Sequence, residues 1–351
     1  MKTFIYGYDG KNPAACAEML KEKGIGAVVA GSFDEAAATA FRAAGMDMYL
    51  CFGAHGIGGK KGGEYRLARD YANREKKWFS SACPNDISLA RERMENALSA
   101  AEKIPDLRGV FVDGARFASF ASAEGMDAFF TCFCPACMEK MQKMGMDGEK
   151  IRAAVRRLSE DEILDLADIP LLRAWLSFRE TCVKQYMDAF SAAVHEKNPR
   201  WQAGAFVFAP SLGVFVGQTE NACAHLDIIS PMLYRAYPHE QGPACMNHEW
   251  AACYALLGKR ADAFRKLGPR LHEETLAGER KNILHGGFLP SAVGDEIAFA
   301  SQRIRPGQIL APIIQIEDER LAETARICLE NGADQTGYFC FSQGKWENTK
   351  K

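Results

Sequence analysis

The stretch Arg108-Gly-Val-Phe-Val-Asp-Gly-Ala-Arg-Phe117 decides the fold of this chain. Val110–Val112 form a short apolar run of β-branched and aromatic residues between two glycines, which is typical of a strand buried on both faces of a parallel sheet. The run ends on Asp113, and burying this carboxylate without a partner would cost several kcal/mol. We therefore expect Asp113 at the carboxyl end of the strand, beside Arg116, where α/β proteins meet their ligands.

Seven further strand-like runs lie along the chain and alternate with helical patterns. They cover Phe4–Tyr8, Ala27–Ala30, Met48–Phe52, Gln202–Phe208, Asp227–Leu233, Leu310–Ile316 and Tyr338–Phe341. Helices are expected from Pro13 to Gly24, from an N-cap at Ser32 with a capping box to Glu35, from Ile87 to Lys103, from about Leu171 to Lys197, and over Arg320–Leu329. The stretch from Asp127 to about Asp165 is also helical in pattern, interrupted at Pro135 and Gly145.

Eight strands that alternate with helices predict an α/β fold, specifically a (β/α)₈ TIM barrel. We expect one domain over residues 1–351, with a long insertion at 236–305, after the sixth strand, that holds at least two helices. The alternative is an open doubly wound sheet, but the glycine fingerprint of dinucleotide-binding sheets is missing. The glycine-rich, basic segment from Gly56 to about Tyr71 is expected to be a mobile loop.

Composition narrows the functional classes. The 351 residues include 43 Lys and Arg against 45 Asp and Glu, a net charge of −2, so no basic excess favours nucleic acid or an anionic membrane as a partner. No apolar run approaches the roughly 20 residues of a membrane helix, and the N-terminal residues lack a signal-peptide core. Most of the twelve cysteines lie in apolar contexts, so we expect reduced thiols and a cytoplasmic protein. The sequence leaves open whether the insertion supports a homo-oligomer.

Polar and aromatic residues follow the strand ends. These are Tyr8, Asp9, His55, Asn85, Asp113, Arg116, Ser211, Met232, Tyr234, Gln315, Glu317, Asp318, Gln343 and Trp346. Carboxylates and amides bind hydroxyl groups, and aromatic rings cover the C–H faces of sugars. A site of this composition favours a neutral polyol over a phosphate.

At these positions the chain resembles uncharacterised bacterial glycoside-hydrolase-like TIM barrels, which are distantly related to α-amylase-type barrels. The resemblance covers roughly residues 75–345 in patches. It is carried by Gly109–Phe117, Cys132-Phe-Cys-Pro-Ala-Cys137, Trp175 with Phe178-Arg179, Asp227-Ile-Ile-Ser-Pro-Met-Leu-Tyr234 and Gly337-Tyr338. Ala115 departs from the bulkier residue that is usual before the arginine. The resemblance implies a TIM barrel and a glycosidase superfamily, and it does not imply a substrate.

Glycoside hydrolysis generally needs two carboxylates, and we expect Asp113 and Glu317 to supply them. Glu317 shares a strand face with Gln315 by two-residue alternation, so both could point into a cleft. Asp318 and Asp9 are the competing partners, and Glu317 could instead cap the following helix. A carboxyl separation of about 5 Å would predict retention of configuration, and about 6.5–9.5 Å inversion.

The other rim residues are expected to bind substrate or to support the carboxylates. Arg116 would keep Asp113 ionised, or would be a plain salt-bridge partner. Tyr234 would contact the sugar or position a carboxylate, although it could also fill the core. His55 and Asn85 are candidates for hydroxyl binding, and Tyr8 and Trp346 for aromatic contact, with packing roles as the alternative for each.

Cys132, Cys134 and Cys137 form the sharpest cysteine pattern, because three thiols within six residues can ligate zinc. Cys83 is a candidate for the fourth ligand. The alternative is reduced packing thiols. A metal here would be structural, so catalysis would require no cofactor.

These observations predict a glycoside hydrolase that acts on an oligosaccharide or glycoside. Two alternatives remain at this stage: a catalytically silent carbohydrate-binding barrel, and a lyase or isomerase that holds a sugar acid with Arg116. No G-x-S-x-G elbow or H-E-x-x-H motif supports serine hydrolase or zinc peptidase chemistry.

Overall fold

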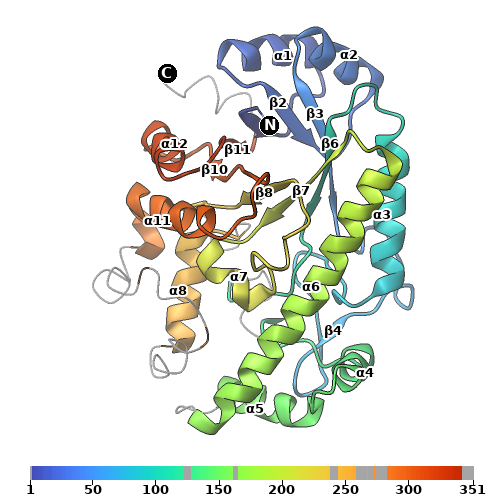
Figure 1. Ribbon diagram of the computed structural model, residues 1–351, viewed down its shortest axis with the longest axis vertical. Helices are drawn as coiled ribbons and strands as arrows, with labels where there is room; N and C mark the ends of the chain where they lie inside the picture. The colour runs from blue at the N-terminus through green and yellow to red at the C-terminus, as the bar shows by residue number, and fades with distance from the viewer. Residues whose placement is uncertain are drawn as a thin grey trace.

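A computed structural model describes residues 2–121, 128–160, 165–237, 244–257, 267, 272 and 283–341 (Figure 1). Its centre is a curled sheet of nine parallel strands in the order β10-β11-β1-β2-β3-β6-β7-β8-β9. The strands are β1 Phe4–Tyr6, β2 Ala27–Ala30, β3 Asp47–Gly53, β6 Gly109–Asp113, β7 Gln202–Val207, β8 Ile228–Pro231, β9 Ile309–Leu310, β10 Ile313–Gln315 and β11 Gly337–Phe339. All eight predicted runs are therefore present, and the expected α/β class is confirmed.

The two ends of the sheet are joined through a single segment. β9 and β10 are consecutive pieces of the chain, separated by Ala311 and Pro312, and they pair with β8 and β11 respectively. Ile313 also bridges to Met232 in parallel, and the Leu233 amide donates to the Ile313 carbonyl over 2.9 Å. The segment 309–315 therefore pairs with strands at both ends of the sheet, and this accounts for the strong curl of the sheet.

Aromatic rings fill the inside of the curled sheet. The ring centroids of Phe4, Phe111 and Phe206 lie 5.0–6.4 Å apart, and all three rings are buried. Two strand glycines leave the room for them. A Cβ added at Gly337 would lie 2.0 Å from the Phe4 ring, and one at Gly204 would lie 2.6 Å from the Phe111 ring.

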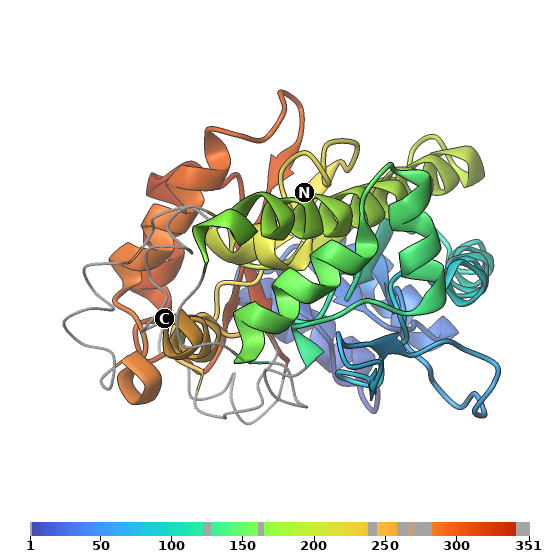
Figure 2. The same ribbon diagram turned by 90° about the horizontal axis from the view of Figure 1, so that it is seen from below.

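Helices cover the outside of the sheet, as the two views show (Figures 1 and 2). They include α1 Pro13–Glu22, α2 Glu35–Ala43, α3 Ile87–Ala101, the long α6 Ile169–Lys197, α7 Pro210–Val216, α11 Pro290–Ser301 and α12 Leu321–Glu330. The predicted capping box at Ser32 is wrong. Asp34 is the N-cap of α2 and accepts from the Ala37 amide over 2.7 Å, so Glu35 is the first residue of the helix instead of the third.

Two loops that follow β3 and β6 carry additional elements. The first holds a short antiparallel pair, β4 Ala68–Arg69 and β5 Glu75–Lys76. β4 lies within the segment from Gly56 to about Tyr71 that was expected to be a mobile loop, and β5 follows it. The second holds α4 Pro135–Lys143, α5 Gly148–Glu160 and the 3₁₀ turn Leu166–Asp168. In Figure 1 β4, α4 and α5 gather at one end of the molecule. The Phe133 amide, which donates to the Arg69 carbonyl over 2.8 Å, joins the two loops.

The segment 236–305 contains the helices α8 Met246–Leu257 and α11 among its described residues, and its status as an insertion stays a prediction. Within the described ranges, no helix is both long enough and apolar enough to cross a lipid bilayer.

Candidate functional site

Asp113 is the last residue of β6 and lies at the carboxyl edge of the sheet, where the sequence placed it. Its side chain is half-buried. Burial raises the pKa of this carboxyl group, whereas the charge of Arg116 and a hydrogen bond from the Gly114 amide act in the opposite direction. The net effect is a carboxyl pKa above its ordinary value.

Phenol groups from other strand ends share this electrostatic environment. Burial raises the pKa of Tyr6, at the end of β1, and of Tyr234, which follows β8, and the negative charge of Asp113 adds to both shifts. The Tyr6 ring lies 5.6 Å from the ring of Phe339, and the Tyr234 ring lies 5.0 Å from it. Tyr234 was predicted here and Tyr6 was not, although it shares the inward face of β1 with Phe4 by alternation.

Arg116 has two acidic residues in its electrostatic surroundings. It is 5% exposed, and its guanidinium stacks 4.5 Å above the Phe208 ring. Asp113 and Glu249 both stabilise its positive charge. Glu249, on α8, accepts hydrogen bonds from the Ser119 hydroxyl at 2.6 Å and the Ala121 amide at 3.0 Å. Sequence reasoning missed Glu249, because no local pattern connects α8 with the loop after β6.

Gln315 and Glu317 have different surroundings. The side chain of Gln315 is buried and donates to the Ala236 carbonyl over 2.8 Å, whereas Glu317 is exposed. β10 ends at Gln315, so the alternation that was expected to give both residues one environment does not extend to Glu317. Glu317 follows the carboxyl end of β10, and its catalytic role stays a prediction.

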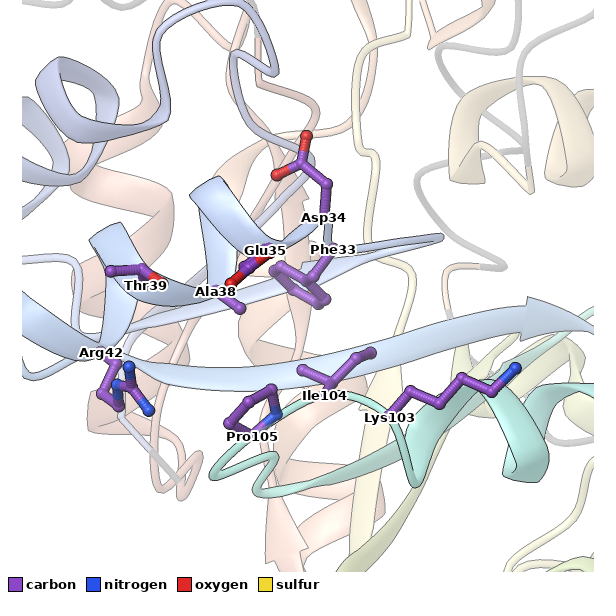
Figure 3. A pocket seen from close by; sticks show the side chains of 9 residues that line it. All are labelled: Phe33, Asp34, Glu35, Ala38, Thr39, Arg42, Lys103, Ile104 and Pro105. Atoms are coloured by element: carbon purple, nitrogen blue, oxygen red, sulfur yellow. The ribbon is translucent and has the colours of Figure 1, made fainter.

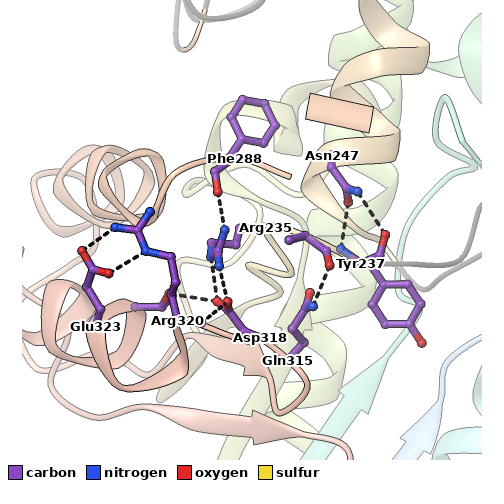
Figure 4. Close-up of polar contacts among 10 residues, drawn as sticks. Arg235, Tyr237, Asn247, Phe288, Gln315, Asp318, Arg320 and Glu323 are labelled. Atoms are coloured by element: carbon purple, nitrogen blue, oxygen red, sulfur yellow. Dashed lines mark hydrogen bonds and ion pairs between the residues drawn. The ribbon is translucent and has the colours of Figure 1, made fainter. Parts of the chain in front are cut away.

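Asp318 belongs to a buried ion pair (Figure 4). Both of its oxygens accept from the Arg235 guanidinium, one of them from Nε at 2.7 Å. The carboxylate also accepts from the Arg320 amide and the Thr324 hydroxyl, each at 2.9 Å. Arg235 in turn donates to the Phe288 carbonyl over 2.6 Å. The predicted substrate contact of Asp318 is therefore not supported, because these donors within the protein already occupy the carboxylate.

Tyr8 and Asp9 make local contacts after β1. The Tyr8 ring stacks on Phe33 with centroids 5.5 Å apart, and its hydroxyl donates to the Ser32 carbonyl over 3.1 Å. Asp9 accepts from the Lys11 amide at 2.9 Å. These contacts fit the packing alternative for Tyr8.

His55 is also packed internally. It is 2% exposed, its ring lies 5.1 Å from that of Tyr186, and burial lowers its pKa to about 4. Its imidazole is therefore neutral at physiological pH. Gln343 and Trp346 lie outside the described residues.

Four thiols meet in a separate, buried cluster. The sulfur atoms of Cys83, Cys132, Cys134 and Cys137 all lie within 4.8 Å of one another, and the Cys83 sulfur is 3.5, 3.7 and 3.6 Å from the other three, respectively. Cys83, the candidate for the fourth ligand, thus lies beside the other three thiols. It comes from the loop after β3, whereas they come from the loop after β6. Asn85, expected at the rim, lies here instead, because its side-chain amide donates to the Cys137 sulfur over 3.2 Å.

The spacing of these thiols suits a tetrahedral metal centre. A Zn–S bond of about 2.3 Å implies S···S edges of about 3.8 Å, whereas a disulfide would bring two sulfurs to about 2.05 Å. Backbone amides of Arg69 and Asn85 approach the sulfurs of Cys132 and Cys83, each at 3.4 Å. Such amide donors stabilise thiolates, which is the form that binds metal.

A further hollow, of about 340 Å³, lies in the outer layer between α2 and the turn after α3 (Figure 3). Its lining residues are Phe33, Asp34, Glu35, Ala38, Thr39, Arg42, Lys103, Ile104 and Pro105. These residues come from a helix and a turn outside the sheet, so the hollow is distinct from the site around Asp113.

The fold has counterparts among solved structures. A β-galactosidase from the Antarctic haloarchaeon Halorubrum lacusprofundi superposes with a TM-score of 0.60 at 14% identity, over 98% of this chain and 53% of that chain. A β-galactosidase from the psychrophilic Marinomonas ef1 superposes with a TM-score of 0.61 at 13% identity, over 98% of this chain and 55% of that chain. A catalytic mutant of a GH42 β-galactosidase from G. stearothermophilus superposes with a TM-score of 0.56 at 13% identity, over 95% of this chain and 50% of that chain.

These likenesses define the fold, and at such identities they define nothing finer. The chain spans about half the length of the structures that it matches. No protein-family model and no curated protein matches the sequence. The resemblance to glycosidase barrels is thus supported at the level of the fold, and the relation to α-amylase-type barrels stays a prediction.

Proposed function

We propose that this protein is a glycoside hydrolase built on a (β/α)₈ barrel. The observation that carries the proposal is Asp113, a carboxylate at the carboxyl end of β6 with a raised pKa and with Tyr6, Arg116 and Tyr234 in its electrostatic surroundings. Catalytic groups in such barrels lie at the carboxyl ends of the strands. The β-galactosidases that share the fold support the same reaction class.

In this proposal Asp113 is the general acid that protonates the leaving oxygen, a role that suits a carboxyl group whose pKa is raised by burial. Glu317 is the second carboxylate, which either attacks the anomeric carbon or activates a water molecule. Glu317 is exposed and follows the carboxyl end of β10. Tyr6 and Tyr234 offer hydroxyl groups to the sugar.

The test is hydrolysis of a panel of chromogenic glycosides, with galactosides included because of the fold neighbours. Asp113→Asn is expected to reduce kcat by about 10²–10⁴-fold on glycosides that need protonation of the leaving group. Asp47→Asn is the matched control, because Asp47 is also half-buried but starts β3 at the opposite edge of the sheet. Equal activity of both variants would contradict the role of Asp113.

Glu317 can be tested against a neighbour in the same turn. Glu317 and Glu319 are both exposed and only two positions apart. Glu317→Gln is expected to abolish hydrolysis and Glu319→Gln to preserve it. If Glu317→Gln is fully active, the second carboxylate is another residue, and Glu249→Gln is the next variant to measure.

A catalytically silent sugar-binding barrel is the second candidate. It is favoured by one observation: the buried acids Glu249 and Asp318 are both bound to donors within the protein, which leaves an exposed residue as the partner of Asp113. Binding of a sugar by the wild-type protein in calorimetry, without release of a reducing end, would favour this candidate over the hydrolase.

We also propose that the four-thiol cluster holds a structural zinc ion. Buried tetrathiolate sites usually hold zinc without an open position for substrate. This ion would link the loop after β3 to the loop after β6 and would leave the chemistry to Asp113. Metal analysis is expected to find one zinc per chain, lost in Cys134→Ala and retained in Cys253→Ala, which changes a buried cysteine outside the cluster.

A further inference from the structure

Arg179, on α6, is a buried cation that has no acid partner among the described residues. Three arginines are buried among the described residues, and two of them have carboxylates: Asp318 for Arg235, and Asp113 with Glu249 for Arg116. Arg179 is 0% exposed and forms no ion pair with a carboxylate in the described part of the chain. Arginine keeps its proton in proteins, and an uncompensated buried charge is strongly unfavourable. Within the described residues, the charge that balances Arg179 must therefore come from a group other than a carboxylate.

The contacts of Arg179 lead to the thiol cluster. Its guanidinium donates to the carbonyls of Phe129, Thr131 and Phe215, and it stacks 3.9 Å from the centre of the Trp175 ring. Thr131 directly precedes Cys132 in the chain. Burial lowers the pKa of the guanidinium, whereas the thiol groups of Cys132 and Cys137 in the cluster, and of Cys182 outside it, act in the opposite direction. The carbonyls and the ring supply partial charges only, whereas thiolates supply full ones.

A second cation reaches the cluster through Asn85. The Lys140 ammonium group donates to the Asn85 side-chain oxygen over 2.9 Å, and the amide of the same side chain donates to the Cys137 sulfur over 3.2 Å. Lys140 is half-buried, and like Arg179 it forms no ion pair with a carboxylate among the described residues. Two hydrogen bonds through the Asn85 side chain thus connect Lys140 to the cluster.

We infer that Arg179 and Lys140 are the cations that neutralise a metal–tetrathiolate centre formed by Cys83, Cys132, Cys134 and Cys137. Four thiolates around one divalent ion carry a net charge of two minus, which these two side chains balance. Four neutral thiols would leave Arg179 without a full counter-charge among the described residues, so the buried arginine is itself an argument for a centre that holds a metal ion. The inference rests on the proposed zinc site and is independent of the proposed glycosidase activity.

The experiment measures Zn²⁺ affinity by competition with a chromophoric chelator, and Co²⁺ absorption as a report on tetrathiolate geometry. The variants are Arg179→Met, which removes the charge, Arg179→Lys, which keeps it, and Lys140→Met. Arg157→Met is the matched control, because Arg157 lies on the neighbouring helix α5 and has its own carboxylate partner, Asp168, at 2.6 Å.

Arg179→Met is expected to weaken Zn²⁺ binding by about 10–100-fold, as the loss of outer-shell partners does at other metal sites. Arg179→Lys should lose clearly less affinity, Lys140→Met should also bind more weakly than wild type, and Arg157→Met should match wild type. If Arg179→Met and Arg179→Lys lose Zn²⁺ affinity equally, the shape of the arginine side chain matters and its charge does not. If the Zn²⁺ affinity is unchanged in both variants, Arg179 has no role in metal binding. Either result overturns the inference.

If Arg179→Met does not fold, the Zn²⁺ affinity of Lys140→Met tests the inference in its place. This side chain lies partly at the surface, so its loss is tolerable, and wild-type Zn²⁺ affinity in the variant overturns the inference. A wild-type protein that binds neither Zn²⁺ nor Co²⁺ refutes the metal site itself. Wild-type binding with unaffected variants refutes only the counter-ion role.

Discussion

Replacement of Asp318 by Asn tests whether this acid serves the fold or the chemistry. The substitution keeps the shape of the side chain and removes the charge that faces the Arg235 guanidinium, which is 6% exposed. Breaking a buried ion pair from one side costs about 3–5 kcal/mol, because the remaining charge stays buried without compensation. Asn can still accept from the Thr324 hydroxyl or the Arg320 amide, so we expect a loss near the lower end, about 3 kcal/mol.

Urea unfolding followed by circular dichroism measures this loss as the shift in midpoint multiplied by the slope m. Glu323→Gln is the matched control, because Glu323 pairs with Arg320 at the surface nearby, and such pairs contribute about 0–1 kcal/mol. Wild-type stability of Asp318→Asn, combined with a large fall in kcat on glycosides, would refute the structural assignment and return Asp318 to the list of catalytic candidates.

Three further outcomes can be measured. Burial raises the pKa of the Asp113 carboxyl group above its ordinary value of 3.8, so protonation of this group stabilises the fold; the stabilisation is complete below pH 3.8 and is lost as the pH rises through the raised pKa. In urea unfolding, Asp113→Asn should therefore gain stability relative to wild type between about pH 4 and 7. A relative loss of stability over this range would contradict the sign of the pKa shift. Gly337→Ala would place a Cβ 2.0 Å from the Phe4 ring and should cost about 1–3 kcal/mol or more, whereas Gly10→Ala, whose nearest contact is 3.9 Å, should melt close to wild type. The His55 imidazole, with its pKa near 4, should show no titration in NMR spectra between about pH 5 and 8, and a midpoint near the ordinary histidine value would show that the ring is solvated.

The strands of the sheet were predictable because each one is a local pattern. Apolar runs between glycines or turn residues, as at Val110–Val112, need no tertiary information. The run Leu310–Ile316 was predicted as one strand and appears as two, because Pro312 lacks the amide that a continuous ladder needs. The β4–β5 pair was missed, since Ala68–Arg69 and Glu75–Lys76 have no alternating pattern and depend on contacts such as that of Arg69 with Phe133.

The candidate site was predictable only where a residue directly follows a strand or belongs to a short motif. Asp113 met the first condition, and the C-x-C-x-x-C triplet met the second and also led to Cys83. Glu249 met neither, because its partner Ser119 is 130 residues away in the chain. Asn85 was assigned to the rim because it follows an apolar run, yet that run continues into the loop beside the thiols.

The pairing of β1 with β11, Phe4 against Gly337, has a consequence for biosynthesis. On the ribosome, β1 cannot pair with β11 until the much later segment that carries Gly337 has been translated. Until then its free edge is exposed to the crowded cell, and premature release or truncation would leave that edge open to association with other chains. Chaperone dependence during synthesis should thus exceed what the stability of the finished molecule suggests.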